Sequence, residues 1–304
     1  MQFGVWTAGA RLGGGEFGEV FEGKSARLHD TICSVCVCVC VCDAAKEWAV
    51  KVAPLQRKGG KKSKSTQSQA AIGLAVERRL YQTELRGCTN VPALPASGAY
   101  GDTEGQRYLV LQRLGETLTQ RADAAGGSLP PSAVAHVGVE VMKALQQAHN
   151  RKYVYVDMKS DNIMCGAGRD SDRVFLVDWG CAYKFKTASG GFLDKAVDAG
   201  NDTHRSLPAT RGEPAAPRDD LESLGYVLLR LATGALPWLS TKSQSAMETM
   251  KATLSTKAMC KGAPAFIEAF LSATRALPLT DAAGIDYDGL MSILTPHVGA
   301  KPFS

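Results

Sequence analysis

The chain has 304 residues, of which 45% are hydrophobic and 21% are charged, and its formal net charge is +5 at pH 7. This length accommodates one two-lobed domain or two small ones, and so modest a charge does not by itself indicate a nucleic-acid partner. We expect no membrane association, because no apolar run reaches the roughly 18 residues of a membrane span, and the nine cysteines, an odd number, favour a reducing compartment over a disulfide framework.

The first feature along the chain is a glycine-rich hairpin at residues 12–23, LGGGEFGEVFEG. Its strand-turn-strand pattern carries the spacing Gly-x-Gly-x-x-Gly-x-Val at Gly13, Gly15, Gly18 and Val20. Glycine lets the backbone approach a bound phosphate, which a side chain would keep away. The spacing alone is a weak signal, and because no helix follows it directly, it does not predict a Rossmann nucleotide site.

A lysine within an apolar strand follows at EWAVKVAP, residues 47–54. An unpaired ammonium in such a strand would be costly, so Lys51 needs an anionic partner. The predicted helix over residues 71–85, AIGLAVERRLYQTEL, supplies Glu77 on a largely apolar face. The alternative is an ordinary surface lysine and an unrelated helix glutamate.

Two unusual segments interrupt this part of the chain. Residues 30–45 include the run CSVCVCVCVC, in which alternation would place cysteines on one face of a strand, where thiolates could bind a soft metal. A Cys-Val repeat is also what a two-base repeat in a gene would encode, and we favour a tolerated hairpin extension. Residues 56–69 are basic and rich in Ser and Gly, which favours a solvated flexible loop over a nuclear-targeting patch.

The middle of the chain combines a strand with a long helix. Residues 107–118, RYLVLQRLGETL, read as a strand followed by a turn into polar sequence. A helical period follows at Val134, Val137, Val141 and Leu145. His149, near the end of that helix, is expected to pack or to cap the helix and not to catalyse.

Four polar residues then lie next to short apolar runs. Asp157, Lys159 and Asn162 lie within VYVDMKSDNIM, and Asp178 ends the apolar run of VFLVDWG. The flanking runs read as strands, so these side chains are predicted on loops at the edge of a core, where chemistry is usually placed. Residues 157–162 taken alone would also fit a surface turn rich in Asp and Asn.

These motifs, in this order, resemble those of protein kinases. Residues 218–238, RDDLESLGYVLLRLATGALPW, and residues 259–294, from MCKGAP to MSIL, resemble the casein kinase 1 group, including its tau-tubulin and vaccinia-related branches. The resemblance implies an α+β, bilobal protein kinase fold as a single domain over residues 1–304. A small five-stranded antiparallel N-lobe with one helix would span residues 1–112, and a larger, mainly helical C-lobe would span residues 113–304.

The resemblance also implies an ATP- and magnesium-dependent protein serine/threonine kinase. Asp157 would accept the proton of the Ser or Thr hydroxyl, and Lys159 would steady the γ-phosphate. Asn162 and Asp178 would hold Mg2+ through oxygen ligands. Its partners would be protein substrates, and we expect a monomer in the cytoplasm or nucleus.

The nucleotide would be held by the Lys51–Glu77 pair, at its α- and β-phosphates, and by the glycine hairpin. Residues 111–114 would line the adenine pocket. Asp220 would bond the backbone of the loop that carries Asp157. Besides that pair and Asp178, the implied nucleotide-site residues are Leu12, Gly13, Gly15, Gly18, Val20, Ala49, Leu111, Gln112 and Leu114.

The chain departs from the kinase pattern at several positions. Tyr155-Val156 replaces the His-Arg before the catalytic Asp, and Trp179 replaces the Phe of Asp-Phe-Gly. We expect Tyr81, Tyr155 and Trp179 to be in contact, with the Tyr155 hydroxyl bonded or reaching solvent. Thr203 replaces an arginine that in the group binds a phosphate next to the target site, so a preference for already phosphorylated substrates is in question.

Two other functions remain as alternatives. A pseudokinase would keep the fold as a nucleotide- or protein-binding module without turnover, for which the Tyr155-Val156 replacement argues. A small-molecule kinase would use the same fold on a sugar or an amine. Those enzymes lack the helix pattern of residues 220–238 and the C-terminal helices predicted here, which argues against the second alternative.

Overall fold

The computed structural model describes residues 1–15, 18–25, 47–56, 68–193, 199–241 and 243–303. It divides into two compact units, one formed by Met1–Thr83 and Pro92–Arg113 and the other by Glu84–Val91 and Leu114–Ser304. The Cys/Val-rich segment lies outside the described residues, and so does the basic loop except at its ends. Within the described ranges, no helix combines the length and the apolar character needed to cross a membrane.

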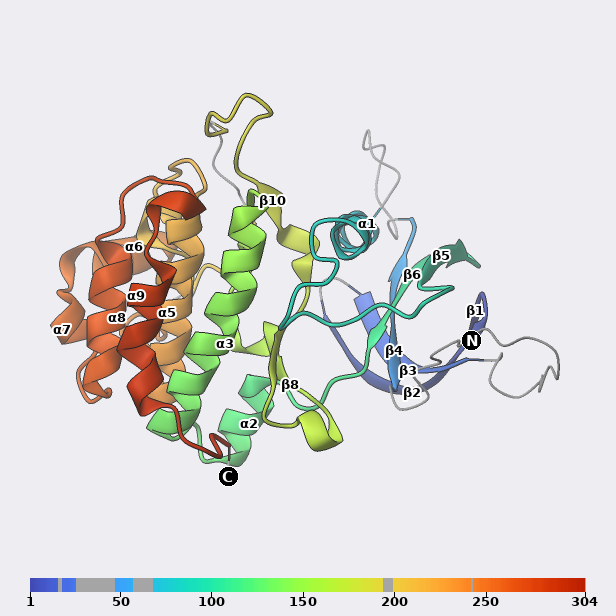
Figure 1. Ribbon diagram of the computed structural model, residues 1–304, viewed down its shortest axis with the longest axis horizontal. Coiled ribbons are helices and arrows are strands. Elements are labelled where there is room, and N and C mark those ends of the chain that lie inside the picture. The colour runs from blue at the N-terminus through green and yellow to red at the C-terminus, as the bar shows by residue number, and fades with distance from the viewer. Residues whose placement is uncertain (16–17, 26–46, 57–67, 194–198, 242, 304) are drawn as a thin grey trace. The chain divides into compact units, whose positions relative to one another are not determined.

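The first unit is built on an antiparallel sheet with the strand order β1-β2-β3-β4-β6-β5 (Figure 1). The described part of this sheet has six strands, one more than the predicted five, because the two residues of β1 pair with the start of β2. Its strands are β1 (Gln2–Phe3), β2 (Trp6–Gly15), β3 (Gly18–Ser25), β4 (Trp48–Pro54), β5 (Tyr100–Thr103) and β6 (Gln106–Gln112).

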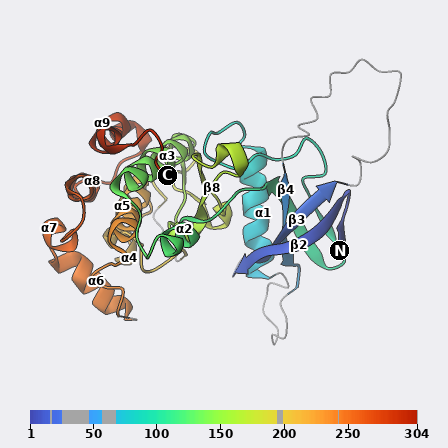
Figure 2. The same ribbon diagram turned by 90° about the horizontal axis from the view of Figure 1, so that it is seen from below.

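One hydrophobic cluster of the first unit lies on one face of this sheet. Val50, Val52 and Val110 pack there with Phe3 and Trp6. The helix α1 (Gln69–Gln82) packs against β4 and β6, and Figure 2 shows it beside the sheet. It begins two residues before the predicted helix, because the Ser68 side chain caps it by accepting the Ala71 N–H at 3.0 Å.

Helices dominate the second unit. Its central helix α3 buries the predicted periodic residues, and α5, α8 and α9 pack together with it (Figure 1). Gly234, with a φ of 73°, ends α5 in the left-handed conformation that favours glycine. The helices are α2 (Leu118–Ala124), α3 (Pro131–Asn150), α4 (Leu207–Thr210), α5 (Pro217–Thr233), α6 (Gln244–Thr253), α7 (Thr256–Met259), α8 (Ala265–Arg275) and α9 (Tyr287–Leu294).

Short strand pairs in the second unit frame two loops. The strands β7 (Tyr153–Val154) and β10 (Tyr183–Lys184) pair antiparallel, as do β8 (Ile163–Cys165) and β9 (Val174–Leu176). The loop of residues 155–162 connects β7 to β8, and residues 177–182 connect β9 to β10. Single helical turns complete the unit: η2 (Ser160–Asn162), η3 (Gly168–Asp170), η4 (Trp179–Cys181), η5 (Ala282–Gly284) and η6 (Thr295–His297).

Candidate functional site

One face of the first unit's sheet gathers several of the predicted nucleotide contacts. Ala49 in β4 lies opposite Leu111 in β6, and Val20 in β3 lies opposite Lys51 in β4. Opposed residues of antiparallel strands project from the same face, as do alternate residues along a strand. Val20, Ala49, Lys51 and Leu111 therefore share the face opposite to the core residue Val50.

Lys51 and Glu77 form the ion pair that the sequence predicts. The Lys51 ammonium donates to Glu77 Oε2 at 2.8 Å, and the Glu77 side chain is 1% exposed. A carboxylate buried so deeply needs a charged or hydrogen-bonded partner, and the strand lysine needs an anion. The pairing is confirmed, and it fixes one ammonium on the sheet face just described.

The glycine hairpin joins β2 to β3, with Gly13 opposite Val20 and Gly15 opposite Gly18. Gly18 has a φ of 118°, and a Cβ there would overlap the carbonyl oxygen of Val52, so the fold itself requires glycine. A Cβ at Gly13 would meet no atom within 4 Å among the described residues outside its chain neighbours. The fold therefore leaves open space at Gly13.

The strand register does not assign three other predicted nucleotide contacts, Leu12, Gln112 and Leu114, to this face. Leu12 is 42% exposed. Gln112 alternates away from Leu111, and its side-chain oxygen accepts the backbone N–H of Ala93 at 3.4 Å. Leu114 belongs to the second unit.

In the second unit, the loop after β7 brings three predicted side chains together. Lys159 donates to Asp157 Oδ2 at 2.6 Å, and the Asn162 side-chain amide donates to the same oxygen at 2.9 Å and to the Asp157 carbonyl at 3.0 Å. Asp157 is 2% exposed. Both carboxylate bonds use Oδ2, and both Asn162 bonds use its nitrogen. They leave Asp157 Oδ1 and the Asn162 side-chain oxygen to other partners.

Asp178 lies directly beyond β9 in a conformation that non-glycine residues rarely adopt. Its φ is 57° and its ψ is 66°, in the left-handed region. Such backbone strain is found at functional sites when the surrounding structure imposes it. The N–H of Val177 donates to the Asn162 carbonyl at 2.9 Å, so the loops that carry Asn162 and Asp178 are joined one residue before Asp178.

The aromatic replacements pack inside the second unit. The rings of Tyr155 and Trp179 meet edge to face with centroids 4.9 Å apart, so this predicted contact is confirmed. The Tyr155 hydroxyl donates to the Val177 carbonyl at 2.6 Å, and Trp179 Nε1 donates to the Leu176 carbonyl at 3.0 Å. Trp179 is fully buried. Tyr81 belongs to the first unit, and its contact with this pair stays a prediction.

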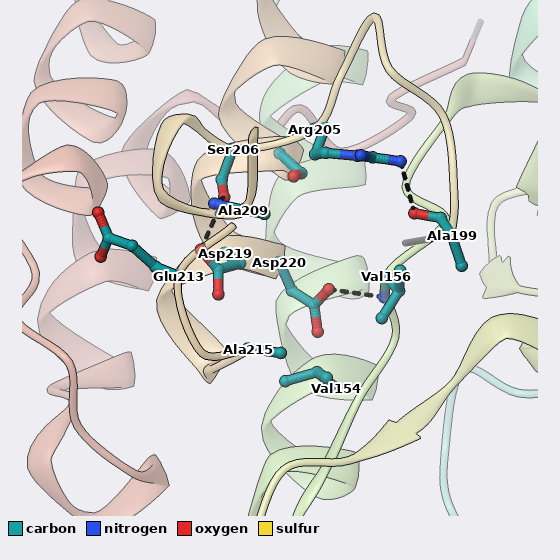
Figure 3. Close-up of a pocket in the computed structure, with 11 residues that line it drawn as sticks. Val154, Val156, Ala199, Arg205, Ser206, Ala209, Glu213, Ala215, Asp219 and Asp220 are labelled. Atoms are coloured by element: carbon teal, nitrogen blue, oxygen red, sulfur yellow. Dashed lines mark hydrogen bonds between the residues drawn. The ribbon is translucent and has the colours of Figure 1, made fainter. Parts of the chain in front are cut away.

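Asp220 at the start of α5 holds the backbone before Asp157, as the sequence predicts. Its carboxylate accepts hydrogen bonds from the N–H of Val156 at 2.9 Å (Figure 3) and from the N–H of Tyr155 at 2.6 Å. The same carboxylate accepts a hydrogen bond from His149 Nε2 at 2.8 Å, and the Tyr287 hydroxyl lies 2.5 Å from His149 Nδ1. His149 is fully buried, so it packs, as expected, inside a hydrogen-bonded chain.

A small pocket of about 30 Å³ adjoins this network. Val156, Ala199 and Arg205 are among its lining residues, and Arg205 donates to the Ala199 carbonyl at 3.0 Å (Figure 3). Asp219 also lines it, and burial raises the pKa of its carboxyl to about 7, although the Ser206 hydroxyl donates to that carboxyl. The segment of residues 199–206 thus packs beside the loop of Asp157.

Two buried polar residues, one within this segment and one in α6, were not predicted from the sequence. His204 is 4% exposed, and burial lowers the pKa of its imidazole to about 3, with further lowering by nearby cations that include Lys159. Lys251 in α6 is completely buried, and burial lowers the pKa of its ammonium to about 8. The sequence does not indicate that Lys251 is buried, because the carbonyls that it contacts lie 46 and 49 residues away.

Across residues 6–272, the sequence matches the protein family described as "Protein kinase domain". The match covers most of the chain. It includes the glycine hairpin, the Lys51–Glu77 pair, the Asp157 loop and Asp178.

Proposed function

The chain belongs to the protein kinase domain family, and from that premise we propose that it is an ATP- and magnesium-dependent protein serine/threonine kinase of the casein kinase 1 group. The observation that carries this proposal is the environment of Asp157. Lys159 and Asn162 both donate to Oδ2, which orients the carboxylate and leaves Oδ1 to an acceptor hydroxyl.

The reaction would transfer the terminal phosphoryl group of ATP to a Ser or Thr side chain. The hydroxyl oxygen of the acceptor forms the new bond to phosphorus as the bond to the β-phosphate oxygen breaks, and ADP leaves. Asp157 accepts the hydroxyl proton, and Lys159, 2.6 Å from that carboxylate, balances negative charge on the transferred group. These residues contribute position and charge and form no covalent intermediate.

Each unit, taken by itself, has donor groups that suit part of a magnesium nucleotide. The open space at Gly13 and the ammonium of Lys51 suit anionic phosphates. The side-chain oxygen of Asn162 and the carboxylate of Asp178 are the hard ligands that Mg2+ prefers. Bound there, magnesium would neutralise phosphate charge.

The assignment to the casein kinase 1 group rests on the resemblance of residues 218–238 and 259–294 to that group. Residues 1–304 would form a single kinase domain acting on protein substrates. We expect it to be a monomer in the cytoplasm or nucleus, without a nucleic-acid or membrane partner.

The test is transfer of labelled phosphate from ATP to dephosphorylated casein by the full chain expressed in bacteria, followed by identification of the labelled amino acid. We expect label on Ser and Thr and none on Tyr. Lys51→Met and Asp178→Asn should each reduce transfer about 100-fold or more, because each removes a charge that contacts the phosphates or the metal. Lys24→Met, the same change at an exposed lysine of β3, should leave transfer unchanged.

Thermal unfolding of the same variants separates chemistry from folding. Lys51→Met and Asp178→Asn should melt within a few degrees of the unsubstituted chain. Loss of the folded state in both would make them structural residues. Binding of magnesium-ATP by an unsubstituted chain that transfers no phosphate would favour the pseudokinase.

A further inference from the structure

Lys251 in α6 is a buried cation that the proposed phosphoryl transfer does not use. It is completely buried, and its ammonium donates to the carbonyls of Asp202 at 3.0 Å and Arg205 at 2.8 Å. The ammonium also lies 5.5 Å from the ring centre of Tyr226 and 5.2 Å from that of Trp238. A buried charge is costly unless such partners replace its water, so this arrangement is built around the ammonium.

Trp238 holds the same stretch of backbone. Its Nε1 donates to the Thr203 carbonyl at 2.7 Å. Two side chains from beyond α5 thus hold three carbonyls among the four consecutive residues 202–205. We call residues 201–206 the anchored turn, which the Arg205 N–H closes by donating to the Asn201 carbonyl at 3.0 Å.

The anchored turn lies beside the residue that precedes Asp157. Gly200 has a φ of 87°, and a Cβ there would lie 2.7 Å from the Val156 carbonyl oxygen, so the two backbones are in close contact. Arg205 and Val156 also line the same small pocket (Figure 3). While the carbonyls are held from the interior, the side chain of Asp202 is exposed. The turn therefore adjoins the loop that would receive the acceptor hydroxyl, and part of its surface is exposed.

We propose that Lys251 is a positioning residue for the protein acceptor, a role that rests on the proposed kinase function. By holding the Asp202 and Arg205 carbonyls inward, it fixes the outer surface of the anchored turn next to Asp157. An acceptor polypeptide that docks on this surface meets a preformed backbone. Preorganisation of this kind improves binding because the ordering cost is already met by the fold.

The test compares three variants of the full chain in steady-state transfer to casein. Lys251→Met keeps the length of the side chain and removes its charge and donors. It should raise the KM for casein about tenfold and leave the KM for ATP within about twofold. Trp238→Phe, which keeps an aromatic ring and removes the Nε1 donor, should change the KM for casein in the same direction. Lys257→Met, the same change at an exposed lysine of α7, should change neither constant.

Hydrogen exchange gives a readout that does not depend on activity. The backbone N–H groups of residues 201–206 should exchange faster in Lys251→Met than in the unsubstituted chain, while those of α3 should not. Unchanged exchange in the anchored turn overturns the anchoring role. Equal increases in the KM for ATP and for casein overturn the positioning role, since they indicate a general loss of structure. If the unsubstituted chain transfers no phosphate, the proposed function is wrong, and so is the role of Lys251 in acceptor binding. The hydrogen-exchange data would then still test whether Lys251 anchors the turn.

Discussion

Asp220 accepts a hydrogen bond from the backbone N–H of Val156, at 2.9 Å, and so holds a β-branched residue at a φ of 77°. Such a conformation is rare for valine and costs about 1–3 kcal/mol. The same carboxylate accepts the N–H of Tyr155 and the Nε2 of His149. We infer that α5 imposes the strained backbone directly before Asp157.

Asp220→Asn should therefore lower the free energy of unfolding by about 3 kcal/mol. The side-chain amide of asparagine would place its own N–H donors against the N–H groups whose hydrogen bonds the carboxylate now accepts. Urea denaturation measures the change. Asp161→Asn, the same substitution at an exposed position, is the control and should have almost no effect. A loss below about 1 kcal/mol for Asp220→Asn would mean that the backbone before Asp157 is held by other contacts.

The hydroxyl of Tyr155 should contribute to stability separately from its ring. Tyr155→Phe keeps the edge-to-face contact with Trp179 but leaves the Val177 carbonyl without this donor. We expect the free energy of unfolding to fall by about 1–3 kcal/mol. Tyr100→Phe, at a tyrosine that is 40% exposed, is the matched control. Equal effects of the two changes would show that the buried hydroxyl bond is not stabilising.

His204 should make the fold sensitive to acid. Burial, with nearby Arg230, Lys251 and Lys159, lowers the pKa of His204 to about 3, whereas in the unfolded chain it stays near 6.5. Below pH 6.5 the unfolded chain binds a proton that the folded chain does not. The free energy of unfolding therefore falls as the pH falls from 6.5 towards 3, by about 2 kcal/mol at pH 5.

Urea denaturation of the unsubstituted chain and of His204→Gln between pH 7 and pH 5 tests this difference. The variant should lose less stability over that range, because glutamine does not titrate. Parallel pH dependences for the two proteins would show that His204 is protonated in the folded chain or is solvated there.

Kinase activity should not require phosphorylation of residues 187–203. In many kinases the arginine before the catalytic Asp pairs with a phosphate in this segment, and Val156 offers neither charge nor donor at that position. Two nearby cations already have partners: Lys186 lies 3.1 Å from Asp281 Oδ2, and Arg205 lies 3.1 Å from Asp202 Oδ1. Lys195, another candidate, lies outside the described residues.

The measurement is transfer to casein by the bacterially expressed chain before and after phosphatase treatment, with Thr187→Ala, Ser189→Ala and Thr203→Ala alongside. Activity should stay within a few fold throughout. A loss of more than about tenfold on dephosphorylation, which corresponds to roughly 1.4 kcal/mol, would contradict the expectation. It would assign the missing role to a lysine, or to an arginine such as Arg205 or Arg211.

Patterns local to the sequence predicted much of this fold. The apolar period located α3, and the cost of an unpaired strand lysine predicted a partner for Lys51, which Glu77 provides. The two-residue strand β1 is too short to show alternation of apolar and polar residues. For this reason five strands were predicted, whereas the described part of the sheet has six. Neither hydrophobic periodicity nor residue type predicts the left-handed backbone of Val156, because Asp220, 64 residues away, imposes it.

The positioning of the site was harder to predict than its residue types. The order of motifs indicated Asp157, Lys159 and Asn162 as a group, and their hydrogen bonds bring them together in the second unit. Lys251 had no such signal. Its acceptors are main-chain carbonyls 46 and 49 residues away. Every residue has such a carbonyl, so the sequence does not indicate which of them accept hydrogen bonds from a side chain.

The most direct test of the central claim is the rate at which labelled phosphate moves from ATP to casein in the unsubstituted chain, Asp157→Asn and Asp161→Asn. Both substitutions remove one carboxylate from the same loop, but Asp157 is buried beside Lys159 and Asn162, whereas Asp161 is exposed. We predict that Asp157→Asn slows transfer by about 10²–10⁴-fold at an unchanged melting temperature, while Asp161→Asn keeps the original rate. A folded Asp157→Asn chain that transfers phosphate at the rate of the unsubstituted chain would contradict the account.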